Sequence, residues 1–430
     1  MKRSLRLQLL TLALALAAGA LICEGVVRMM TDSDPDGQIY LRGERLFPYR
    51  IPLRRIGRLL EERENSRENA YIIPDPALGW TIAPFGSVEA GLYRANSRGI
   101  RSRPKEYSLD PPPGVLRIAL FGDSFTHGDE EPYVQTWGHL LEDELRKRGI
   151  EAEVINFGVP AYGIGQAYLR WKLLGRGFAP RVAVFGFQVE NIKRTINIFR
   201  VFYSASSGLP FSKPRFVLTR TGDLELVNSP VIPPEKIVET LRDFPRSPLA
   251  RYEYWFNPKS YSSAFWFRSR LACLIRTLFP PASPDRQEAD GWLEPGGETV
   301  RLILAILERF AREVEASGGT PIILNIPAKS ELKNFQKGIR SYYFLFRELE
   351  QAGIPVVDPV PMMAGKHGLY KKGGHFSSRG GRIVADTLVD TIIRLIDTAP
   401  FRSATASGAG ESGRLSVGKE TEKTGSPALE

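Results

Sequence analysis

Apolar residues along this chain come in short runs that are separated by longer amphipathic segments. Five apolar runs lie at 116–121, 152–157, 182–187, 320–326 and 354–358. Runs of this length are typical of strands that are buried on both faces. Helical spacing between them predicts helices at 135–148, 165–174, 298–316, 340–351 and 380–396. Alternating strands and helices predict an α/β fold, with a five-stranded parallel sheet covered on both faces.

This alternation stops after the third strand. A polar helical turn at 190–197 is followed by a long insertion, residues 198–297. The insertion is expected to contain a hairpin that pairs 215–219 with 224–227, and an aromatic-rich helix around 262–278. Half of the chain's tryptophans also fall here, at Trp255, Trp266 and Trp292. They either stack on sugar rings or pack in a core, and packing is favoured.

Both ends of the chain differ from the middle. Lys2, Arg3 and Arg6 precede an apolar run, Leu7–Cys23, which predicts a membrane anchor or signal over 1–30, with a retained anchor favoured. Basic residues before the run place the amino end in the cytoplasm and the remainder outside it. Residues 31–114 read as a stalk and a loop-rich lead-in. Residues 397–430 read as a disordered tail, which leaves 115–396 as the main domain.

Charge and cysteine content narrow the partners. The net charge of +10 is spread along the chain without a basic, aromatic-rich block, so nucleic acid is not expected. The excess instead favours anionic surfaces such as lipid or acidic polymer. The two cysteines are Cys23, inside the apolar run, and Cys273. We therefore expect no disulfide and no metal cluster, and the chain has no phosphate-binding glycine loop that would indicate a nucleotide cofactor.

The first strand ends at Gly122-Asp123-Ser124. A glycine turn there would hold a serine hydroxyl at the carboxyl end of the strand, where open parallel sheets bind ligands. A following helix would place its positive end behind the serine, as a nucleophile requires. The alternative is a simple helix N-cap, for which serine and aspartate are both suited. The nucleophile is the favoured interpretation.

Other strand ends supply complementary groups. The second strand ends at Asn156-Phe157-Gly158, the third is followed by Asn191, and the loop after the fifth carries His375. Ser124, Gly158, Asn191 and His375 therefore fall on one rim of the sheet. These four residues resemble the set that names the SGNH/GDSL hydrolase superfamily, and the chain looks most similar to its bacterial membrane-anchored members. The resemblance covers 115–195 and 318–396, and the flanks 75–80 and 96–101 look like that subgroup's lead-in.

That resemblance implies a flavodoxin-like three-layer sandwich and esterase or acyl-transfer chemistry. Ser124 would attack an ester carbonyl, and His375 would take its proton. Backbone N–H groups of Ser124 and Gly158 and the Asn191 amide would hold the oxyanion.

The chain departs from the family at two places. An aspartate usually stands two or three residues before the histidine, whereas this chain has Lys372 and Gly373. A backbone carbonyl or another acid, such as Asp358 or Glu190, would then orient His375. Asn191 is followed by isoleucine where the family usually has aspartate.

Further polar residues flank these motifs. His127 lies one helical turn after Ser124 and could line the pocket, although its short tether makes it a poorer base. His139 is expected to be structural and His367 to lie on a surface loop. Arg194, Asn197 and Arg200 follow Asn191 at spacings of three. They would share a helix face that either binds an anionic sugar or carboxylate or is simply solvated.

Together these features predict a membrane-anchored, extracytoplasmic serine esterase or O-acyltransferase with a Ser–His dyad. It would cross the inner membrane once, with a periplasmic catalytic domain acting on acylated carbohydrate or cell-envelope polymer. The alternative is a non-catalytic module of the same fold that binds envelope glycan. The missing aspartate is the main support for that alternative.

Overall fold

The computed structural model describes residues 2–88, 91–103, 105–261, 264–279 and 291–398 of the chain. Its centre is a five-stranded sheet of β8 (Leu116–Phe121), β9 (Ala152–Asn156), β10 (Val182–Phe187), β13 (Thr320–Asn325) and β14 (Val356–Val357). The spatial order is β14-β13-β10-β8-β9, and every neighbouring pair is parallel. In chain order this is 2-1-3-4-5, the flavodoxin-like arrangement. The predicted fold class is therefore confirmed.

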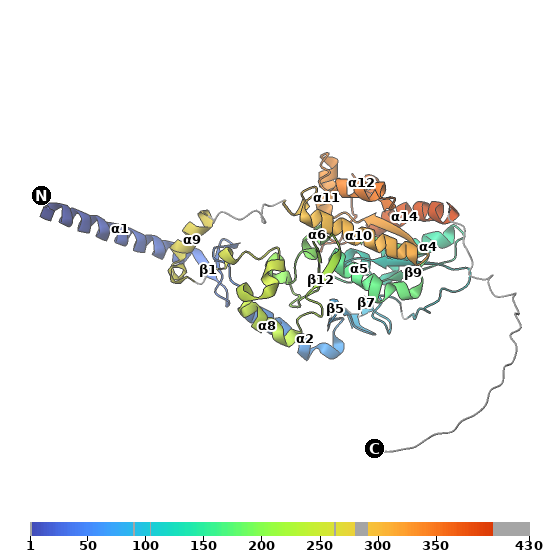
Figure 1. The fold of residues 1–430 in the computed structure, drawn as a ribbon, viewed down its shortest axis with the longest axis horizontal. Helices are drawn as coiled ribbons and strands as arrows, with labels where there is room; N and C mark the ends of the chain where they lie inside the picture. The colour runs from blue at the N-terminus through green and yellow to red at the C-terminus, as the bar shows by residue number, and fades with distance from the viewer. Residues whose placement is uncertain (1, 89–90, 104, 262–263, 280–290, 399–430) are drawn as a thin grey trace, which may run out of the picture.

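Helices cover both faces of this sheet (Figure 1). One layer contains α4 (Trp137–Lys147) and α14 (Ser378–Thr398), and the other contains α5 (Ile164–Leu173), α10 (Glu298–Ala316) and α12 (Tyr343–Gln351). Alternation along β8 shows why both layers form. Ile118 and Leu120 pack into the first layer, whereas Ala119 and Phe121 pack into the second. Each fully buried side chain of the larger kind stabilises the fold by roughly 1.5–3 kcal/mol.

Most predicted elements lie within a few residues of the observed ones. The strand predicted at 354–358 is shorter, because Pro355 has no N–H to donate to the ladder. Two short helices near the carboxyl end, α11 (Lys329–Gln336) and α13 (Val360–Met363), were not predicted. Short 3-10 turns lie at 67–69, 133–135, 175–178, 244–246, 248–252, 258–260, 265–268 and 291–293.

The lead-in is more regular than the predicted loops. It contains α2 (Leu53–Asn65) and three small antiparallel sheets. Their strands are β1 (Thr31–Ser33), β2 (Ile39–Leu41), β3 (Glu44–Arg45), β4 (Ile72–Asp75), β5 (Gly79–Ile82), β6 (Ser87–Val88) and β7 (Tyr93–Arg94). Such short strands are too brief for an alternating pattern to stand out. Trp80, Ile82 and Ile100 are buried in the main core, so this part of the lead-in packs as part of the α/β domain.

Inside the insertion, the predicted hairpin is confirmed as β11 (Arg215–Leu218) and β12 (Leu224–Val227). It is joined by α7 (Arg200–Tyr203), α8 (Pro234–Arg242) and α9 (Arg270–Leu278). The predicted aromatic-rich helix is two elements, a 3-10 turn at Phe265–Arg268 and then α9, while 262–263 lie outside the described residues.

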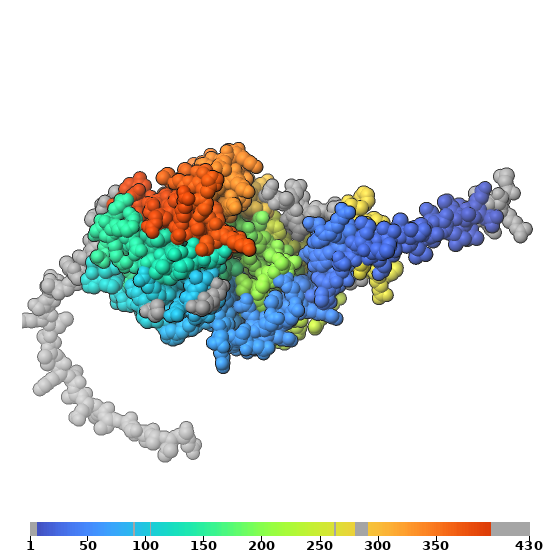
Figure 2. Space-filling model, turned by 180° about the vertical axis from the view of Figure 1, so that it is seen from behind, coloured from blue at the N-terminus to red at the C-terminus, as the bar shows by residue number. Residues whose placement is uncertain are grey.

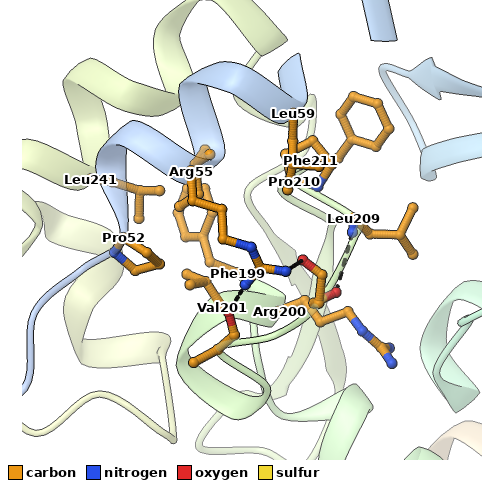
Figure 3. A pocket seen from close by; sticks show the side chains of 13 residues that line it. Pro52, Arg55, Leu59, Phe199, Arg200, Val201, Leu209, Pro210, Phe211 and Leu241 are labelled. Carbon is orange, nitrogen blue, oxygen red and sulfur yellow. Dashed lines mark hydrogen bonds between the residues drawn. The ribbon is translucent and has the colours of Figure 1, made fainter. Parts of the chain in front are cut away.

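The insertion is fastened to α2 at a crevice shown in Figure 3. Arg55 of α2 donates to the carbonyls of Ala205, Ser206 and Ser207. The cavity left between the two parts is about 10 Å³, roughly the space for a single water. This crevice is therefore a filled contact rather than a ligand pocket.

The amino-terminal helix α1 (Lys2–Met30) extends away from the body (Figures 1 and 2). Its segment Leu7–Met30 is long and apolar enough to cross a membrane. Cys23 and Cys273 are both free, as predicted. The tail predicted to be disordered lies outside the described residues from 399 onward.

Candidate active site

The serine turn is built by close packing at the ends of two neighbouring strands. The short helix α3 (Ser124–His127) starts directly after β8. A Cβ at Gly122 would lie 2.2 Å from Thr126 Oγ1, and one at Gly186 would lie 2.4 Å from the same atom. Both glycines are thus needed to seat Thr126 between the ends of β8 and β10. This is where the strand order reverses, the place at which doubly wound sheets bind ligands.

Asp123, rather than Ser124, caps α3. One of its carboxylate oxygens accepts from the Phe125 N–H at 3.0 Å, and the other pairs with Arg194 at 3.2 Å. The capping role that competed with the nucleophile interpretation is therefore filled by the neighbouring residue. The Ser124 hydroxyl is left for a different partner.

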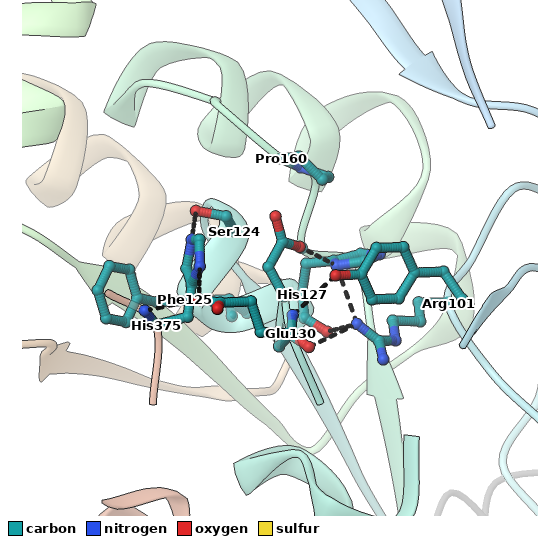
Figure 4. Close-up of polar contacts among 12 residues, drawn as sticks. Arg101, Ser124, Phe125, His127, Glu130, Pro160 and His375 are labelled. Atoms are coloured by element: carbon teal, nitrogen blue, oxygen red, sulfur yellow. Dashed lines mark hydrogen bonds and ion pairs between the residues drawn. The ribbon is translucent and has the colours of Figure 1, made fainter. Parts of the chain in front are cut away.

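That partner is His375. Its Nε2 lies 2.9 Å from Ser124 Oγ, and its Nδ1 lies 2.9 Å from Glu130 Oε2 (Figure 4). A carboxylate can only accept, so Nδ1 carries the proton and Nε2 is free to accept from the serine. The Phe125 ring packs against the imidazole with centroids 5.1 Å apart. Serine, imidazole and carboxylate thus form one hydrogen-bonded chain.

Glu130 is held from both ends. Its backbone N–H donates to the Tyr93 hydroxyl at 2.7 Å, and its φ is +67°. Its carboxylate accepts from the backbone N–H groups of Gly373, at 2.8 Å, and His375, at 3.2 Å. A Cβ at Gly373 would lie 2.7 Å from the carboxylate oxygens, so only glycine permits this approach. Burial raises the pKa of Glu130, but its hydrogen bonds with His375 and Gly373 outweigh burial and leave the pKa below its usual value.

The two acids proposed from the sequence to orient His375 do not contact it, so that prediction is wrong. Asp358 accepts from Asn325 at 2.8 Å and from Tyr343 at 3.0 Å. Glu190 accepts from the Tyr203 hydroxyl and lies 3.9 Å from Arg194. Both acids are engaged elsewhere.

One signal in the sequence could have identified Glu130. Three consecutive acids, Asp129 to Glu131, follow the nucleophile turn directly. The usual aspartate before His375 is absent, so a carboxylate had to come from another segment. The acids at 129–131 are the ones that follow Ser124 most closely in the sequence, which makes them candidates.

Behind the serine lies a second cluster around His127, whose side chain is completely buried. His127 Nε2 is 2.6 Å from the Tyr71 hydroxyl, and its Nδ1 contacts Asp129 and Arg101. Arg101 also donates to the carbonyls of His127 at 2.8 Å and Glu131 at 2.6 Å. Burial and the Arg101 charge lower the pKa of His127 to about 4. The predicted pocket role of His127 is therefore wrong, and the cluster braces the loop that carries Glu130.

The Gly158 N–H, a predicted oxyanion donor, is already paired. It donates to Asn156 Oδ1 at 2.9 Å. A Cβ at Gly158 would lie 2.4 Å from the His127 nitrogen and 2.8 Å from the Thr126 carbonyl carbon. The glycine is therefore required by the backbone of α3, not by the space an oxyanion would occupy.

Asn191 meets the rim from the next strand. It lies in α6 (Glu190–Thr195), directly after β10, which neighbours β8 in the sheet. The residue is buried, and its Oδ1 has no hydrogen-bond partner among the residues that the structure describes. An amide oxygen accepts, so Oδ1 could meet a donor group of a ligand, whereas the predicted oxyanion role would use the Nδ2 hydrogens of the same side chain.

The predicted basic helix face does not form. Helix α6 ends at Thr195, so Asn197 and Arg200 do not continue its surface. Asn197 is 1% exposed, and burial lowers the pKa of Arg200 to about 10. Arg194 alone of this group contacts the nucleophile turn, through Asp123.

The remaining histidines behave as expected, but Trp266, which was expected to pack in a core, is 56% exposed. His139 is buried in α4, and His367 is exposed. Trp292 is buried beneath Lys193, and Trp255 donates to the Lys193 carbonyl at 3.0 Å. No group of three or more potential metal ligands gathers within the described ranges.

Comparison with known proteins finds distant structural likenesses only. No family model and no curated protein matches the sequence. Solved structures similar to this chain include a lipase/acylhydrolase from Enterococcus faecalis, with 17% identity over 64% of this chain and 94% of that one, at a TM-score of 0.34. The psychrotrophic esterase EstA from Pseudoalteromonas sp. gives 12% identity, 66% and 99% coverage and a TM-score of 0.34. A GDSL-like lipase from Bacteroides thetaiotaomicron has 10% identity over 65% of this chain and 89% of that one, at a TM-score of 0.31. With scores this low, the case for a function rests on the chain's own geometry.

Proposed function

We propose that this chain is a serine hydrolase of the SGNH/GDSL superfamily, an esterase or O-acyltransferase whose triad is Ser124, His375 and Glu130. One observation carries the proposal. Two contacts of 2.9 Å link the serine hydroxyl, the imidazole and the carboxylate in the order that nucleophilic catalysis needs. They lie at the switch point of a flavodoxin-like sheet, where such folds bind ligands.

In the proposed mechanism, Ser124 Oγ forms a bond to the ester carbonyl carbon while His375 Nε2 takes the hydroxyl proton. Glu130 stabilises the resulting imidazolium. The tetrahedral intermediate then expels the alcohol, which receives that proton from His375. Water, or the hydroxyl of an acceptor, attacks the acyl-serine with His375 again as the base. The bond between the acyl carbon and Ser124 Oγ then breaks, and His375 returns the proton to the serine. Esterase and transferase differ only in this acceptor.

The Ser124 backbone N–H and the Asn191 side chain are the proposed oxyanion donors. The Gly158 N–H donates to Asn156 Oδ1. It can donate to the oxyanion only if it gives up that hydrogen bond. Each such donor typically contributes about 10²–10³-fold to the rate.

We place this active site outside the cytoplasm, on a chain that crosses the inner membrane once. Supporting features are the apolar segment Leu7–Met30 and the basic residues that precede it. An esterase site there would meet acylated carbohydrate or cell-envelope polymer. An alkaline phosphatase fused after residue 400 should be active and membrane-bound, whereas an inactive fusion would contradict the topology.

A second candidate function is binding of envelope glycan without catalysis. Its support was the lack of an aspartate before His375. Glu130 supplies a carboxylate at His375 Nδ1 from the segment after α3, which removes that support. The intact chain of contacts favours the enzyme.

A fluorophosphonate probe tests the proposal on the full-length protein in detergent. The wild type should be labelled, Ser124→Ala should not, and Ser66→Ala should match the wild type as a control on an exposed serine. Labelling of Ser124→Ala at the wild-type rate would contradict the assignment, and an unlabelled wild type would favour the glycan-binding module.

A further inference from the structure

The insertion carries an apolar surface beside the base of α1, which the catalytic site does not use. We call residues 265–279 the foot. Five large apolar side chains of the foot, each 49–73% exposed, are Phe265, Trp266, Ile275, Leu278 and Phe279. Solvent-exposed aromatic and aliphatic side chains gathered at this density mark an interaction surface.

The foot is fixed to α1 by polar contacts. Both oxygens of the Glu24 carboxylate accept from the start of α9: the Arg270 N–H at 3.0 Å, the Leu271 N–H at 2.8 Å and the Ser269 hydroxyl at 2.7 Å. Arg28 of α1 donates to the Arg268 carbonyl at 3.0 Å. These bonds hold α9 beside the last turns of α1, and yellow atoms flank the blue helix at its base in Figure 2.

Helix α9 has two unlike faces. Its inner face carries Cys273, which is buried, and Thr277, whose hydroxyl accepts from the Phe47 N–H at 2.8 Å. Its outer face carries Ile275, Leu278 and, just beyond the helix end, Phe279, at the three- and four-residue spacings of one helical stripe. The inner face fastens the helix to the protein, so the outer face is available to something else.

The position of the foot along α1 indicates which part of the membrane it contacts. About 20 helical residues cross the roughly 30 Å hydrocarbon layer, so a span that starts at Leu7 leaves it near Val27. Glu24 and Arg28, to which α9 is fastened, bracket that level. The foot therefore lies where the hydrocarbon layer gives way to lipid headgroups, the zone in which tryptophan and other amphipathic side chains concentrate.

The charge of the foot fits the same environment. Its 15 residues include Arg268, Arg270 and Arg276 and no aspartate or glutamate. Next to it is an open hollow of about 860 Å³, lined by Trp266, Phe279 and Arg276 among others, with Lys259 at its edge. Apolar side chains flanked by cations are what an interfacial helix presents to anionic phospholipid.

We propose that the foot is a lipid-binding surface, which inserts its apolar face into the leaflet on the catalytic domain's side of the membrane that α1 crosses. This second attachment fixes the orientation of the catalytic body relative to the bilayer, which a single helix would not do. The proposal rests on the membrane-anchor part of the proposed function. It does not depend on the chemistry at Ser124.

Depth measurements on the full-length protein in phosphatidylglycerol/phosphatidylcholine vesicles test this proposal. A nitrobenzoxadiazole label is placed at Leu278→Cys in the foot, Leu14→Cys in α1 or Ile339→Cys on the catalytic body, in a Cys23→Ser background. Cys273 is buried, and the background protein without an added cysteine measures any labelling of it. Doxyl groups on the lipid tails should quench the labels at 278 and 14 several-fold more than the label at 339.

Each result has one meaning. Quenching at 14 but not at 278 contradicts lipid insertion of the foot and still supports a membrane-spanning α1. Quenching at neither overturns both, and quenching at 278 alone supports the foot while contradicting the span.

A second measurement addresses charge. Arg268→Gln with Arg276→Gln should weaken quenching at 278 in vesicles rich in phosphatidylglycerol and change it little in pure phosphatidylcholine. Hydrolysis of a soluble ester should be unchanged, which separates the foot from the active site. Equal quenching in both lipids by both proteins would overturn the role of the arginines.

Discussion

Two chains of hydroxyl, imidazole and carboxylate lie on either side of the one-turn helix α3. In front, Ser124, His375 and Glu130 meet at the rim of the sheet, with the histidine side chain 23% exposed. Behind, Tyr71, His127 and Asp129 make the same sequence of contacts, yet the His127 side chain is fully buried. Similar groups at similar distances thus serve different purposes.

Burial and one cation separate the two clusters. Desolvation disfavours the imidazolium that a general base must become, and Arg101 beside His127 disfavours it further. His375 instead faces the carboxylate of Glu130, and no arginine in the described part of the chain bonds to its ring. Burial also raises the pKa of the Tyr71 phenol above its usual value, so this hydroxyl stays protonated. A list of hydrogen bonds alone would not tell the proposed catalytic cluster from the structural one.

The largest expected effect on activity comes from the front cluster, Ser124, His375 and Glu130. Ser124→Ala and His375→Ala should each lower kcat/KM for p-nitrophenyl acetate by at least about 10³-fold, since triad members act as a unit. Tyr71→Phe, the matched loss of the hydroxyl in the rear cluster, should keep activity within about 10-fold of the wild type. A loss in Tyr71→Phe as large as that in Ser124→Ala would break the comparison.

Glu130→Gln should lower kcat by about 10²–10⁴-fold, because the amide cannot stabilise the imidazolium and favours the wrong tautomer. Glu190→Gln is the control, since Glu190 was one of the acids proposed from the sequence and its carboxylate contacts Tyr203 and Arg194 rather than His375. Steady-state kinetics on both variants decide between them. If Glu190→Gln proves the more damaging, Glu130 is not the orienting acid.

A smaller effect is expected from a methyl group. In Gly373→Ala, the added Cβ would press on the Glu130 carboxylate at 2.7 Å and move it away from His375. Displacements of this size cost about 10–10²-fold in rate. Gly177→Ala, which has open space around its Cβ and an ordinary φ, should leave kcat unchanged. Full activity in Gly373→Ala would mean that the carboxylate needs no such close fit.

The rear cluster, Tyr71, His127 and Asp129, should affect the stability of the fold rather than the catalytic rate. His127 has a folded pKa of about 4, below its ordinary value of about 6.5. Between those values the unfolded chain binds a proton that the folded protein refuses, so the free energy of unfolding falls as the pH falls. The expected slope is at most about 1.4 kcal/mol per pH unit, with no contribution above pH 6.5. Urea unfolding of the full-length protein in detergent from pH 7.5 to 4 measures it, and a His127→Gln variant with an unchanged slope would contradict the assignment.

How far the sequence could predict this molecule depended on how local each feature is. The apolar runs at β8, β10 and β13 and the serine turn are properties of a few consecutive residues, and all were recognised. Glu130 depends on a contact across 245 positions and on a left-handed φ at the residue itself, and the run of acids in which it lies does not show which of them reaches His375. The strands of the lead-in were missed because each has two to four residues, too few to show an alternation.

The histidines illustrate the same limit. His375 was expected to reach Ser124, because a loop before the last helix returns to the rim, and the structure brings the two side chains together. His127 was expected near the pocket because it is close to Ser124 in sequence. It faces the other way, since Tyr71 and Arg101 of the lead-in enclose it, and these belong to a segment interpreted as loops.

The most direct test of the central claim, that His375 with Glu130 activates Ser124 while His127 does not, is the rate at which Ser124 itself reacts. Mass spectrometry would follow phosphonate adduct formation on the Ser124 peptide in the full-length wild type, His375→Gln and His127→Gln. We predict an adduct on Ser124 in the wild type, a rate at least about 10²-fold slower in His375→Gln, and a rate near that of the wild type in folded His127→Gln. An adduct on another residue, or a greater loss in His127→Gln than in His375→Gln, would contradict the account.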